Sequence, residues 1–437
     1  MTLHDGAECA PATNLHDSAE RALALMRRQG FEQAQVDASQ REHSEVNLAH
    51  NAPSLLRSGE YCKLALVGLH DGRKATTELN DLAPERIDEA VAALWRGVAS
   101  APQDPANAVS SGQRARIEKG PRQLEPERLT EACAELLAYR ARETPTMLIQ
   151  EAYASHSRLQ AVTLTSGGSD LVVDMGWYEL SVMGNARVGR QTSSFNYTGG
   201  QADRLGDIPV VEHFGIGAMM HELERQWQTQ SFDQPFVGDV VLTPPAVAGL
   251  LGWLQGQISD AALIADSSLY RHHVGEQVAS PLLDLRSRFD AAGVAAVSAD
   301  GFGTPAVEVL HQGRLMCLTP GLYASRKTGI AHVPVAAGGW EIAAGATPLA
   351  RMLAGVSRGA LVGRLSMGAP AANGDFSGVV KNSFAIQRGE VGSALSEVMI
   401  SGNVAQMLRD VVAVSAERID TGSLCLPWLR IAGLHFS

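Results

Sequence analysis

The sequence predicts an α+β fold, in which an N-terminal domain of one sheet with helices precedes a C-terminal domain of mainly antiparallel β structure. Three observations support this prediction. Helical periodicity occurs mostly in the first half, polar and apolar residues alternate in strand-like runs, and short apolar runs recur between Gly and Pro in the second half. We expect the domains to cover residues 1–235 and 236–437. With 437 residues, of which 45% are hydrophobic, the chain can bury a large core.

The N-terminal half begins with an expected amphipathic helix over Leu15–Gln29, which Gly30 ends. Further along, Asp71 and Gly72 are expected to form the turn of a hairpin. Residues 167–170 are interpreted as a second hairpin turn and not as a phosphate loop, because no lysine or helix start follows them. The other expected elements are strands at 33–40, 44–49, 63–69, 74–79, 147–154, 159–166, 170–178 and 179–188, helices at 84–99, 129–142 and 216–230, and a connecting loop at 100–126.

The C-terminal half is expected to contain few helices and many short strands, which favours an antiparallel sheet, barrel or sandwich. Helices are predicted at 243–259, 322–328 and 404–409. The expected strands are at 238–242, 294–297, 306–310, 315–318, 361–367, 384–388, 411–414 and 429–432.

Charge and cysteine usage exclude several classes of protein. The formal net charge of −11 opposes binding to phosphates, so we expect no nucleic acid partner. No apolar run approaches the ~20 residues that span a bilayer, and acidic residues near the N-terminus are unlike a signal peptide, so we expect no membrane association or export. The five cysteines are scattered singly, at Cys9, Cys62, Cys133, Cys317 and Cys425. This usage favours reduced thiols and a cytoplasmic location.

The segment from Thr243 to Ser259, TPPAVAGLLGWLQGQIS, is expected to form a helix directly after a short strand. It carries no histidine, cysteine or carboxylate. Zinc is held by imidazole, thiolate or carboxylate ligands, and a water that attacks a peptide bond needs a nearby carboxylate to take its proton. The helix therefore lacks every residue type that zinc peptidase chemistry requires.

Seven further segments follow this helix in a fixed order: RFDAAG at 288–293, QGRL at 312–315, LYASRK at 322–327, GDFSG at 374–378, FAIQRGE at 384–390, ISGNV at 400–404 and LRI at 429–431. In content and order they resemble the TldD/PmbA peptidase family. Each segment alone is a weak signal, but chance turn and strand motifs would not keep the order. The resemblance implies the fold and a link to proteolysis, although function depends on the site and not on the fold.

Through the resemblance, the helix at 243–259 corresponds to the helix that carries the zinc motif in part of the family. TldD-type members carry His-Glu-x-x-x-His on this helix and a later cysteine ligand, whereas TldE-type members, also called PmbA, lack both and pair with a TldD-type chain. Here Gly252, Trp253 and Gln257 occupy the first ligand, general base and second ligand positions. Cys425 stands too close to residues 429–431 to match the family's cysteine ligand, and the loop expected at 415–426 contains a single glycine. The resemblance therefore implies no catalytic residue and no metal in this chain, with zinc in the partner subunit.

No other set of residues replaces the missing zinc ligands in the sequence. His221 is followed by Arg225 and Gln226 where a second ligand would stand, and His213 lies roughly two turns earlier at ~3.6 residues per turn. We interpret this helix face as solvated. The adjacent pair His272-His273 points apart in a strand. The Gly-x-Ser-x-Gly elbow of serine hydrolases does not occur either.

The preferred hypothesis is a non-catalytic TldE-like subunit that pairs with a TldD-like zinc subunit. Together they would cleave unfolded or modified peptides, including leaders of ribosomally made natural products. Trp253, Gln257, Asp375 and Phe376 are the candidates for lining a peptide or partner groove, and β-strand addition is the expected mode of peptide recognition. Core packing by Trp253 and a turn at Asp375 remain open as structural alternatives. A stand-alone peptide-binding scaffold, such as a homodimer, and an independent hydrolase are the other functions left open.

Overall fold

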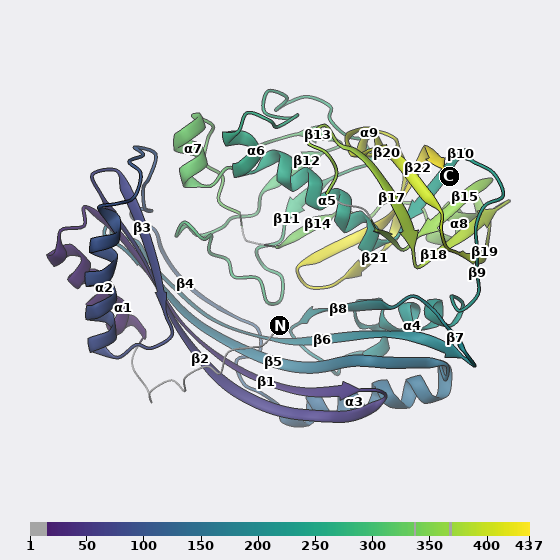
Figure 1. Ribbon diagram of the computed structural model, residues 1–437, viewed down its shortest axis with the longest axis horizontal. Coiled ribbons are helices and arrows are strands. Elements are labelled where there is room, and N and C mark those ends of the chain that lie inside the picture. The colour runs from purple at the N-terminus through teal and green to yellow at the C-terminus, as the bar shows by residue number, and fades with distance from the viewer. Residues whose placement is uncertain (1–14, 336–337, 367–368) are drawn as a thin grey trace.

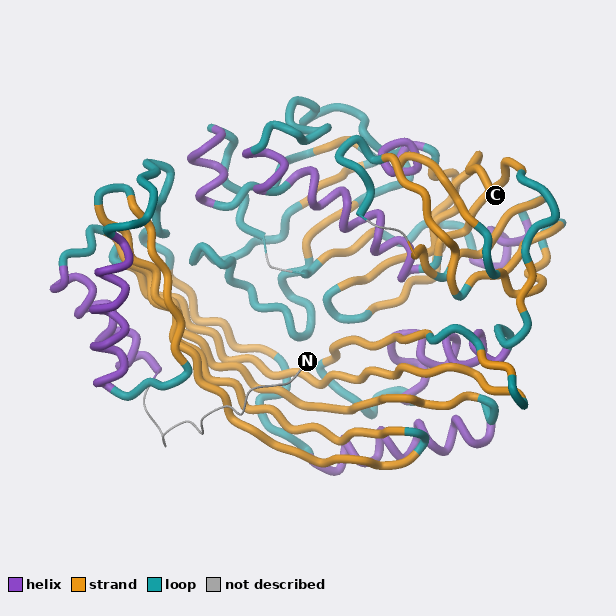
Figure 2. Tube along the Cα trace, in the orientation of Figure 1, coloured by secondary structure: helices purple, strands orange, loops and turns teal. Residues whose placement is uncertain are grey.

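Two large β-sheets dominate the computed structural model of the chain, which describes residues 15–335, 338–366 and 369–437 (Figure 1). Within these residues the first sheet has eight strands and the second has fourteen. Figure 2 shows the first sheet as long curved strands that run beneath the shorter strands of the second. The predicted α+β class is confirmed. Each helix in these ranges is too short or too polar to cross a membrane.

The first sheet is built from unusually long strands that pair in the order β3-β2-β1-β5-β6-β4, with β7 and β8 also paired to β6. Its strands are β1 Gln33–Ala49, β2 Ala52–His70, β3 Arg73–Leu79, β4 Arg114–Lys119, β5 Met147–Thr165, β6 Asp170–Val188, β7 Gln191–Thr192 and β8 Asn196–Ala202. The hairpin turns expected at Asp71-Gly72 and at 167–170 are present.

Three predicted breaks in this sheet do not exist. The strands expected at 33–40 and 44–49 form the single strand β1, and the four strands expected between 147 and 188 form β5 and β6. The residues at the expected breaks, such as 41–43 and 155–158, include no Gly, Pro or Asn that would turn the chain. The loop expected at 100–126 also contains β4, which pairs in parallel with β6. These predictions were wrong because polar residues can continue a strand when one face of the sheet is not buried in a helix layer.

Helices cover one face of the first sheet, and the second sheet lies over the other. Even-numbered residues of β1, including Val36 and Leu48, belong to two apolar cores that the helices complete. On the opposite face, Met175 and Trp177 of β6 pack against Ala295 of the C-terminal half. The covering helices are α1 Leu15–Gln29, α2 Pro84–Val98, α3 Pro126–Glu143, the 3-10 helix η1 Val210–Gly215 and α4 Ile216–Glu224.

The second sheet is mostly antiparallel, with parallel pairs between β10 and β15, β14 and β22, and β9 and β19. Its strands are β9 Thr229–Gln230, β10 Phe236–Leu242, β11 Leu285–Ser287, β12 Glu308–His311, β13 Arg314–Leu315, β14 Trp340–Ile342, β15 Arg358–Val362, β16 Arg364–Ser366, β17 Asp375–Lys381, β18 Ser383–Gln387, β19 Glu390–Leu395, β20 Met399–Asn403, β21 Val411–Asp420 and β22 Leu424–Phe436. The helices of this half are α5 Pro244–Ile258, α6 Asp260–Ile264, α7 Leu322–Thr328, α8 Leu349–Ala354 and α9 Val404–Arg409.

Three further expectations need correction. Residues 294–297 form no strand; Val297 makes an isolated bridge, and its side chain packs on β6 of the first sheet. The helix expected at 216–230 ends at Glu224, because Thr229 and Gln230 join the second sheet as β9. The strand expected at 361–367 is divided between β15 and β16, and Met367 lies outside the described residues.

Candidate functional site

The helix that lacks zinc ligands is α5, and it lies directly after the central strand β10 of the second sheet. Pro244 and Pro245 occupy its first positions, where the missing N–H groups of proline cost no helical hydrogen bond. One face of α5 is buried in the core of the C-terminal half. The exposed face carries Pro245 and three glycines, Gly249, Gly252 and Gly256.

These three glycines leave most of the exposed face of α5 without side chains beyond Pro245. An added Cβ at any of them would meet no other atom within 4 Å. Glycine inside a helix costs roughly 0.5–1 kcal/mol relative to alanine, and nothing in the packing requires it here. Gly252, at the position of the first zinc ligand, therefore faces open space.

Trp253 and Gln257 point the other way and are bound within the chain. The Trp253 Nε1–H donates to the carbonyl oxygen of Ala371 at 3.2 Å, and the Gln257 amide donates to that of Ala372 at 3.0 Å. Gln257 also accepts a hydrogen bond of 2.8 Å from the backbone N–H of Leu269. Trp253 is only 9% exposed. The two side chains thus connect residues 371–372, just before β17, to α5 by hydrogen bonds.

Asp375 and Phe376 lie beside the same segment. Phe376 is buried in the C-terminal core with Trp253. Asp375 is exposed, and hydrogen bonds from Asn403 and Asn373 lower the pKa of its carboxyl. Of the four predicted groove residues, Asp375 is therefore the one that reaches the surface.

The candidate replacement ligands do not come together. His221 is hydrogen-bonded to the hydroxyl of Tyr139 at 2.9 Å, and His273 lies 2.7 Å from Glu276. His213 is buried, which lowers its pKa. In the described ranges, groups of three or more ligand-type side chains close enough to share an ion occur twice, and neither group includes a residue of α5: His16, Asp17 and Glu20, and Asp284, Glu308 and His311.

The helix face around His221 is less solvated than predicted. Glu222 is partly buried, and this burial raises the pKa of its carboxyl to about 7. Glu224 accepts hydrogen bonds from the backbone N–H and hydroxyl of Thr146. The interpretation as a solvated face was therefore wrong for Glu222, which turns inward.

The cysteines follow the prediction with one exception. Cys133, Cys317 and Cys425 are free thiols, but Cys62 is disulfide-bonded, and Cys9 lies outside the described residues. Burial raises the pKa of Cys425 above its usual value, which disfavours the thiolate that metals bind. The expected loop at 415–426 is instead a hairpin between β21 and β22, with its turn at Thr421-Gly422-Ser423.

A row of Ser157, His43 and Glu45 on the first sheet has the residue types of a serine hydrolase triad. The Ser157 hydroxyl lies 2.9 Å from His43, and His43 lies 3.1 Å from Glu45. However, Ser157 is 1% exposed, and the Arg41 guanidinium also donates to its oxygen at 2.9 Å. A substrate carbonyl has no approach to this oxygen, so we interpret the row as a structural network.

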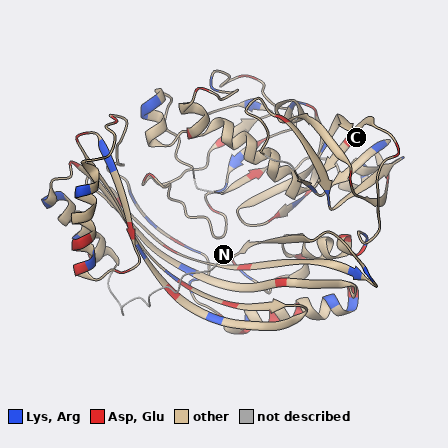
Figure 3. Cartoon of the chain, viewed as in Figure 1, with Lys and Arg blue, Asp and Glu red and all other residues tan. Residues whose placement is uncertain are grey.

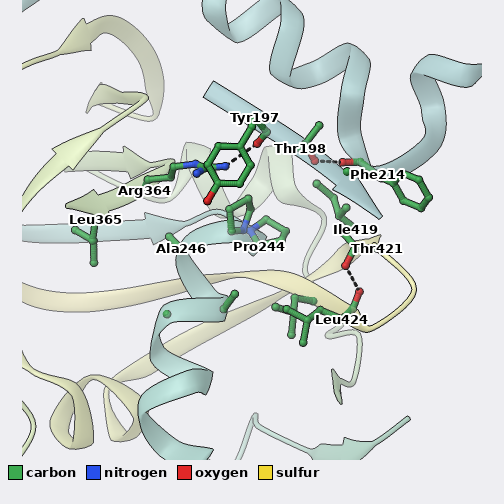
Figure 4. Close-up of a pocket in the computed structure, with 15 residues that line it drawn as sticks. Tyr197, Thr198, Phe214, Pro244, Ala246, Arg364, Leu365, Ile419, Thr421 and Leu424 are labelled. Carbon is green, nitrogen blue, oxygen red and sulfur yellow. Dashed lines mark hydrogen bonds between the residues drawn. The ribbon is translucent and has the colours of Figure 1, made fainter. Parts of the chain in front are cut away.

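A groove opens between the two sheets at the N-terminal end of α5 (Figure 4). Its volume is about 370 Å³. Five parts of the chain meet there: β8, η1, the start of α5, β16 and the β21–β22 hairpin. The lining residues are Tyr197, Thr198, Gly199, Phe214, Pro244, Pro245, Ala246, Ala248, Gly249, Arg364, Leu365, Ile419, Thr421, Leu424 and Leu426.

Strand β8 presents one edge of its backbone to this groove. β6 is its strand partner, and on its other side the N–H of Gln201 donates to Thr421 while the carbonyl of Tyr197 accepts from Arg364. Because backbone groups alternate in direction along a strand, those of Gly199 also point away from β6. The described residues supply no partner for the Gly199 N–H and C=O on that side. An extended peptide could pair there.

Arg364 forms one wall of the groove. Its guanidinium stacks on the ring of Tyr197 at 3.3 Å, and one Nη donates to the Tyr197 carbonyl at 2.6 Å. Figure 4 shows the pair beside Pro244 at the start of α5. Sequence analysis did not identify any of these groove residues. Tyr197 and Arg364 are 167 positions apart, and no local pattern marks either.

Charge elsewhere on the molecule is mixed. Figure 3 shows acidic and basic residues interspersed along the long strands and helices of the first sheet, with no large region of one sign in this view. Many of them pair with each other, for example Arg158 with Asp174 at 2.9 Å. Arg364 is one of several arginines that have no carboxylate within ion-pair distance among the described residues.

The C-terminal half and the overall fold both have known relatives. Residues 237–437 match the PmbA/TldA metallopeptidase C-terminal domain. These C-terminal residues therefore belong to the TldD/PmbA family, and the whole chain is similar to a member of it. It is 24% identical over 389 residues to the metalloprotease PmbA of Escherichia coli O157:H7, covering 85% of each chain. A metalloprotease PmbA homolog of Haemophilus influenzae is 24% identical over 206 residues, 44% of this chain and 46% of that protein.

Solved structures show the same fold at low sequence identity. TldE from Thermococcus kodakarensis superposes with a TM-score of 0.84 at 16% identity, covering 96% of this chain and 100% of that one. A proposed modulator of DNA gyrase from Bacteroides thetaiotaomicron has a TM-score of 0.84 at 20% identity, covering 97% and 98%. These likenesses establish the architecture.

Proposed function

We propose that this chain is the non-catalytic, TldE-like subunit of a zinc metalloprotease whose other subunit is TldD-like. The complex would cleave unfolded or modified peptides, such as leaders of ribosomally made natural products. The observation that carries the proposal is the state of α5. Gly252 offers no side chain, and Trp253 and Gln257 are hydrogen-bonded to residues 371 and 372 of their own chain.

The chemistry explains why a partner is needed. Peptide hydrolysis by zinc requires three protein ligands, an open position for water and a general base. An amide such as Gln257 is a poor zinc ligand, and an indole takes no proton from water. In the proposed complex, zinc and the base come from the TldD-like subunit, while this chain contributes binding surface.

The groove beside β8 supports a role in holding peptide. The free backbone of Gly199 on this strand edge can give hydrogen bonds that do not depend on the peptide's side chains, which suits a protease for varied unfolded substrates. The apolar walls formed by Ala248, Leu365 and Leu424 can bury alternate side chains. The names of the relatives, metalloprotease PmbA and TldE, are consistent with this proposal.

The test is reconstitution. This chain and a TldD-like chain from the same source are purified separately and together, and association is measured by light scattering after size-exclusion chromatography. We expect a one-to-one complex that cleaves an unfolded peptide, with activity lost on chelation or when the partner's first zinc-helix histidine is replaced by alanine.

Three outcomes would overturn the proposal. Cleavage by this chain alone, resistant to chelators, would show that it is itself a hydrolase. A stable homodimer that binds peptide but never associates with a TldD-like chain would instead support the scaffold function. Stoichiometric zinc in the isolated chain would contradict both functions.

A further inference from the structure

We propose that the groove beside β8 selects the C-terminal carboxylate of an extended peptide, and that Arg364 binds it. This inference rests on the proposed function, because it assigns a ligand end to the groove that would hold peptide. It adds a selectivity that backbone pairing alone would not produce.

The first argument is charge. Of the fifteen residues that line the groove, Arg364 is the single charged one. Its Nε is buried and has no hydrogen-bond partner among the described residues. An arginine without a counter-charge in an apolar setting is costly, and a planar carboxylate matches the guanidinium fork with two parallel hydrogen bonds.

The second argument is the position of the arginine. Stacking on the Tyr197 ring and the bond to the Tyr197 carbonyl hold the guanidinium at one end of the free edge of β8. Because Tyr197 holds the guanidinium in place, little side-chain entropy remains to be lost when a ligand binds. The first turn of α5 also lines the groove. The positive end of its helix dipole favours a negatively charged ligand there.

The third argument is the length of the free edge. The Gln201–Thr421 hydrogen bond closes β8 on one side of Gly199, and the Arg364–Tyr197 bond closes it on the other. Only the backbone of Gly199 remains between them. A long strand passing through would find its other hydrogen-bonding positions taken, whereas a chain end can pair at Gly199 and place its carboxylate on Arg364. The volume of about 370 Å³ is also small among ligand pockets, which span roughly 300–1,000 Å³.

The experiment compares peptides that differ at one end. An unstructured peptide of about ten residues, within the length that strand addition uses, carries fluorescein at its N-terminus and is made with a C-terminal acid or a C-terminal amide. A third version is the amide with glutamate as its penultimate residue. Binding to the full-length chain, alone and with its TldD-like partner, is followed by fluorescence anisotropy at low salt.

We expect the acid to bind about tenfold or more tightly than the amide, because hydrogen bonds to a charged group are strong enough for that ratio. Arg364→Met should remove the preference, and Arg364→Lys should restore part of it. Arg358→Met is the matched control. Arg358 also stacks on an aromatic ring, that of Phe236 at 3.7 Å, but does not line the groove, so the preference should survive its loss.

The outcomes separate this inference from the function on which it rests. Equal binding of acid and amide would overturn carboxylate selection and leave the peptide groove intact. Binding of the glutamate amide as tightly as the acid would show that an acidic side chain, and not the chain end, is recognised. Absence of binding by all three peptides would contradict the proposed function itself.

Discussion

The two halves of α5 differ in what faces them, and neither half carries a charged residue. The N-terminal half, with Pro245, Ala248 and Gly249, borders an open groove between the sheets. In the C-terminal half, Trp253 and Gln257 are packed against the segment at 371–372. The positions of the general base and the second zinc ligand in a TldD-type chain, Trp253 and Gln257, are thus part of the core here, while the half of the helix beside β8 borders the groove.

This difference shows how a binding surface can persist when a reaction centre is absent. Catalytic groups must be exposed and polar, and without a metal such groups would be unsatisfied in a partly buried site. Filling those positions with an indole and an amide that find hydrogen-bond partners removes that cost. The groove needs no such change, because the proposed peptide binding uses its backbone edge and apolar walls and no zinc.

The largest effect is expected from removing Trp253. Trp253→Ala should lower the free energy of unfolding by about 3–5 kcal/mol, since it leaves a cavity beside Phe376 and removes the bond to Ala371. Urea denaturation measures the change, and Trp253→Phe is the control that keeps most of the volume. If Trp253→Ala instead left stability unchanged and weakened peptide binding, Trp253 would line the groove, and the contrast between the two halves would fail.

A smaller effect is expected from filling the groove. Gly249→Leu should weaken peptide binding about tenfold or more, equivalent to about 1.4 kcal/mol, by occupying the space next to Arg364 and β8. Gly256→Leu is a closely matched control: the same helix face, the same open surroundings and a position outside the groove lining. Equal binding losses in both variants, measured by anisotropy, would place the peptide along the whole helix.

The smallest effect is expected at the former ligand position. Gly252→Ala should raise the free energy of unfolding by about 0.5–1 kcal/mol, because alanine favours helix and its methyl group meets no atom within 4 Å. Thermal and urea unfolding can detect this gain. A loss of stability would instead mean that another protein chain, such as a partner subunit in a stable dimer, packs against Gly252 and leaves no room for the methyl group.

Much of the fold could be predicted because local patterns determine it. The helix α1 and the turn at Asp71-Gly72 were predicted where they occur, since amphipathic spacing and turn residues act locally. The long strands β5 and β6 were predicted in pieces. The middle residues of β5 at 155–158 are polar, and their pairing with neighbouring strands keeps them in strand conformation.

Less of the candidate site than of the fold could be predicted from the sequence. Sequence could show that α5 lacks zinc ligands, but it could not show where Trp253 and Gln257 point. It also could not identify the groove, because Gly199 and Arg364 come from separate halves of the chain. Asp375 and Phe376, predicted to line a peptide or partner groove, lie at the start of β17, where Phe376 is buried in the core.

The sequence by itself determined what this chain cannot do on α5: a helix without imidazole, thiolate or carboxylate holds no zinc, whatever surrounds it. It also determined the α+β class, because periodicity of apolar residues is a local property. Only the tertiary structure decided which face of α5 is open and which is sealed. It alone brought Arg364, Tyr197 and the free edge at Gly199 together, because contacts between residues more than 160 positions apart depend on how the two sheets pack.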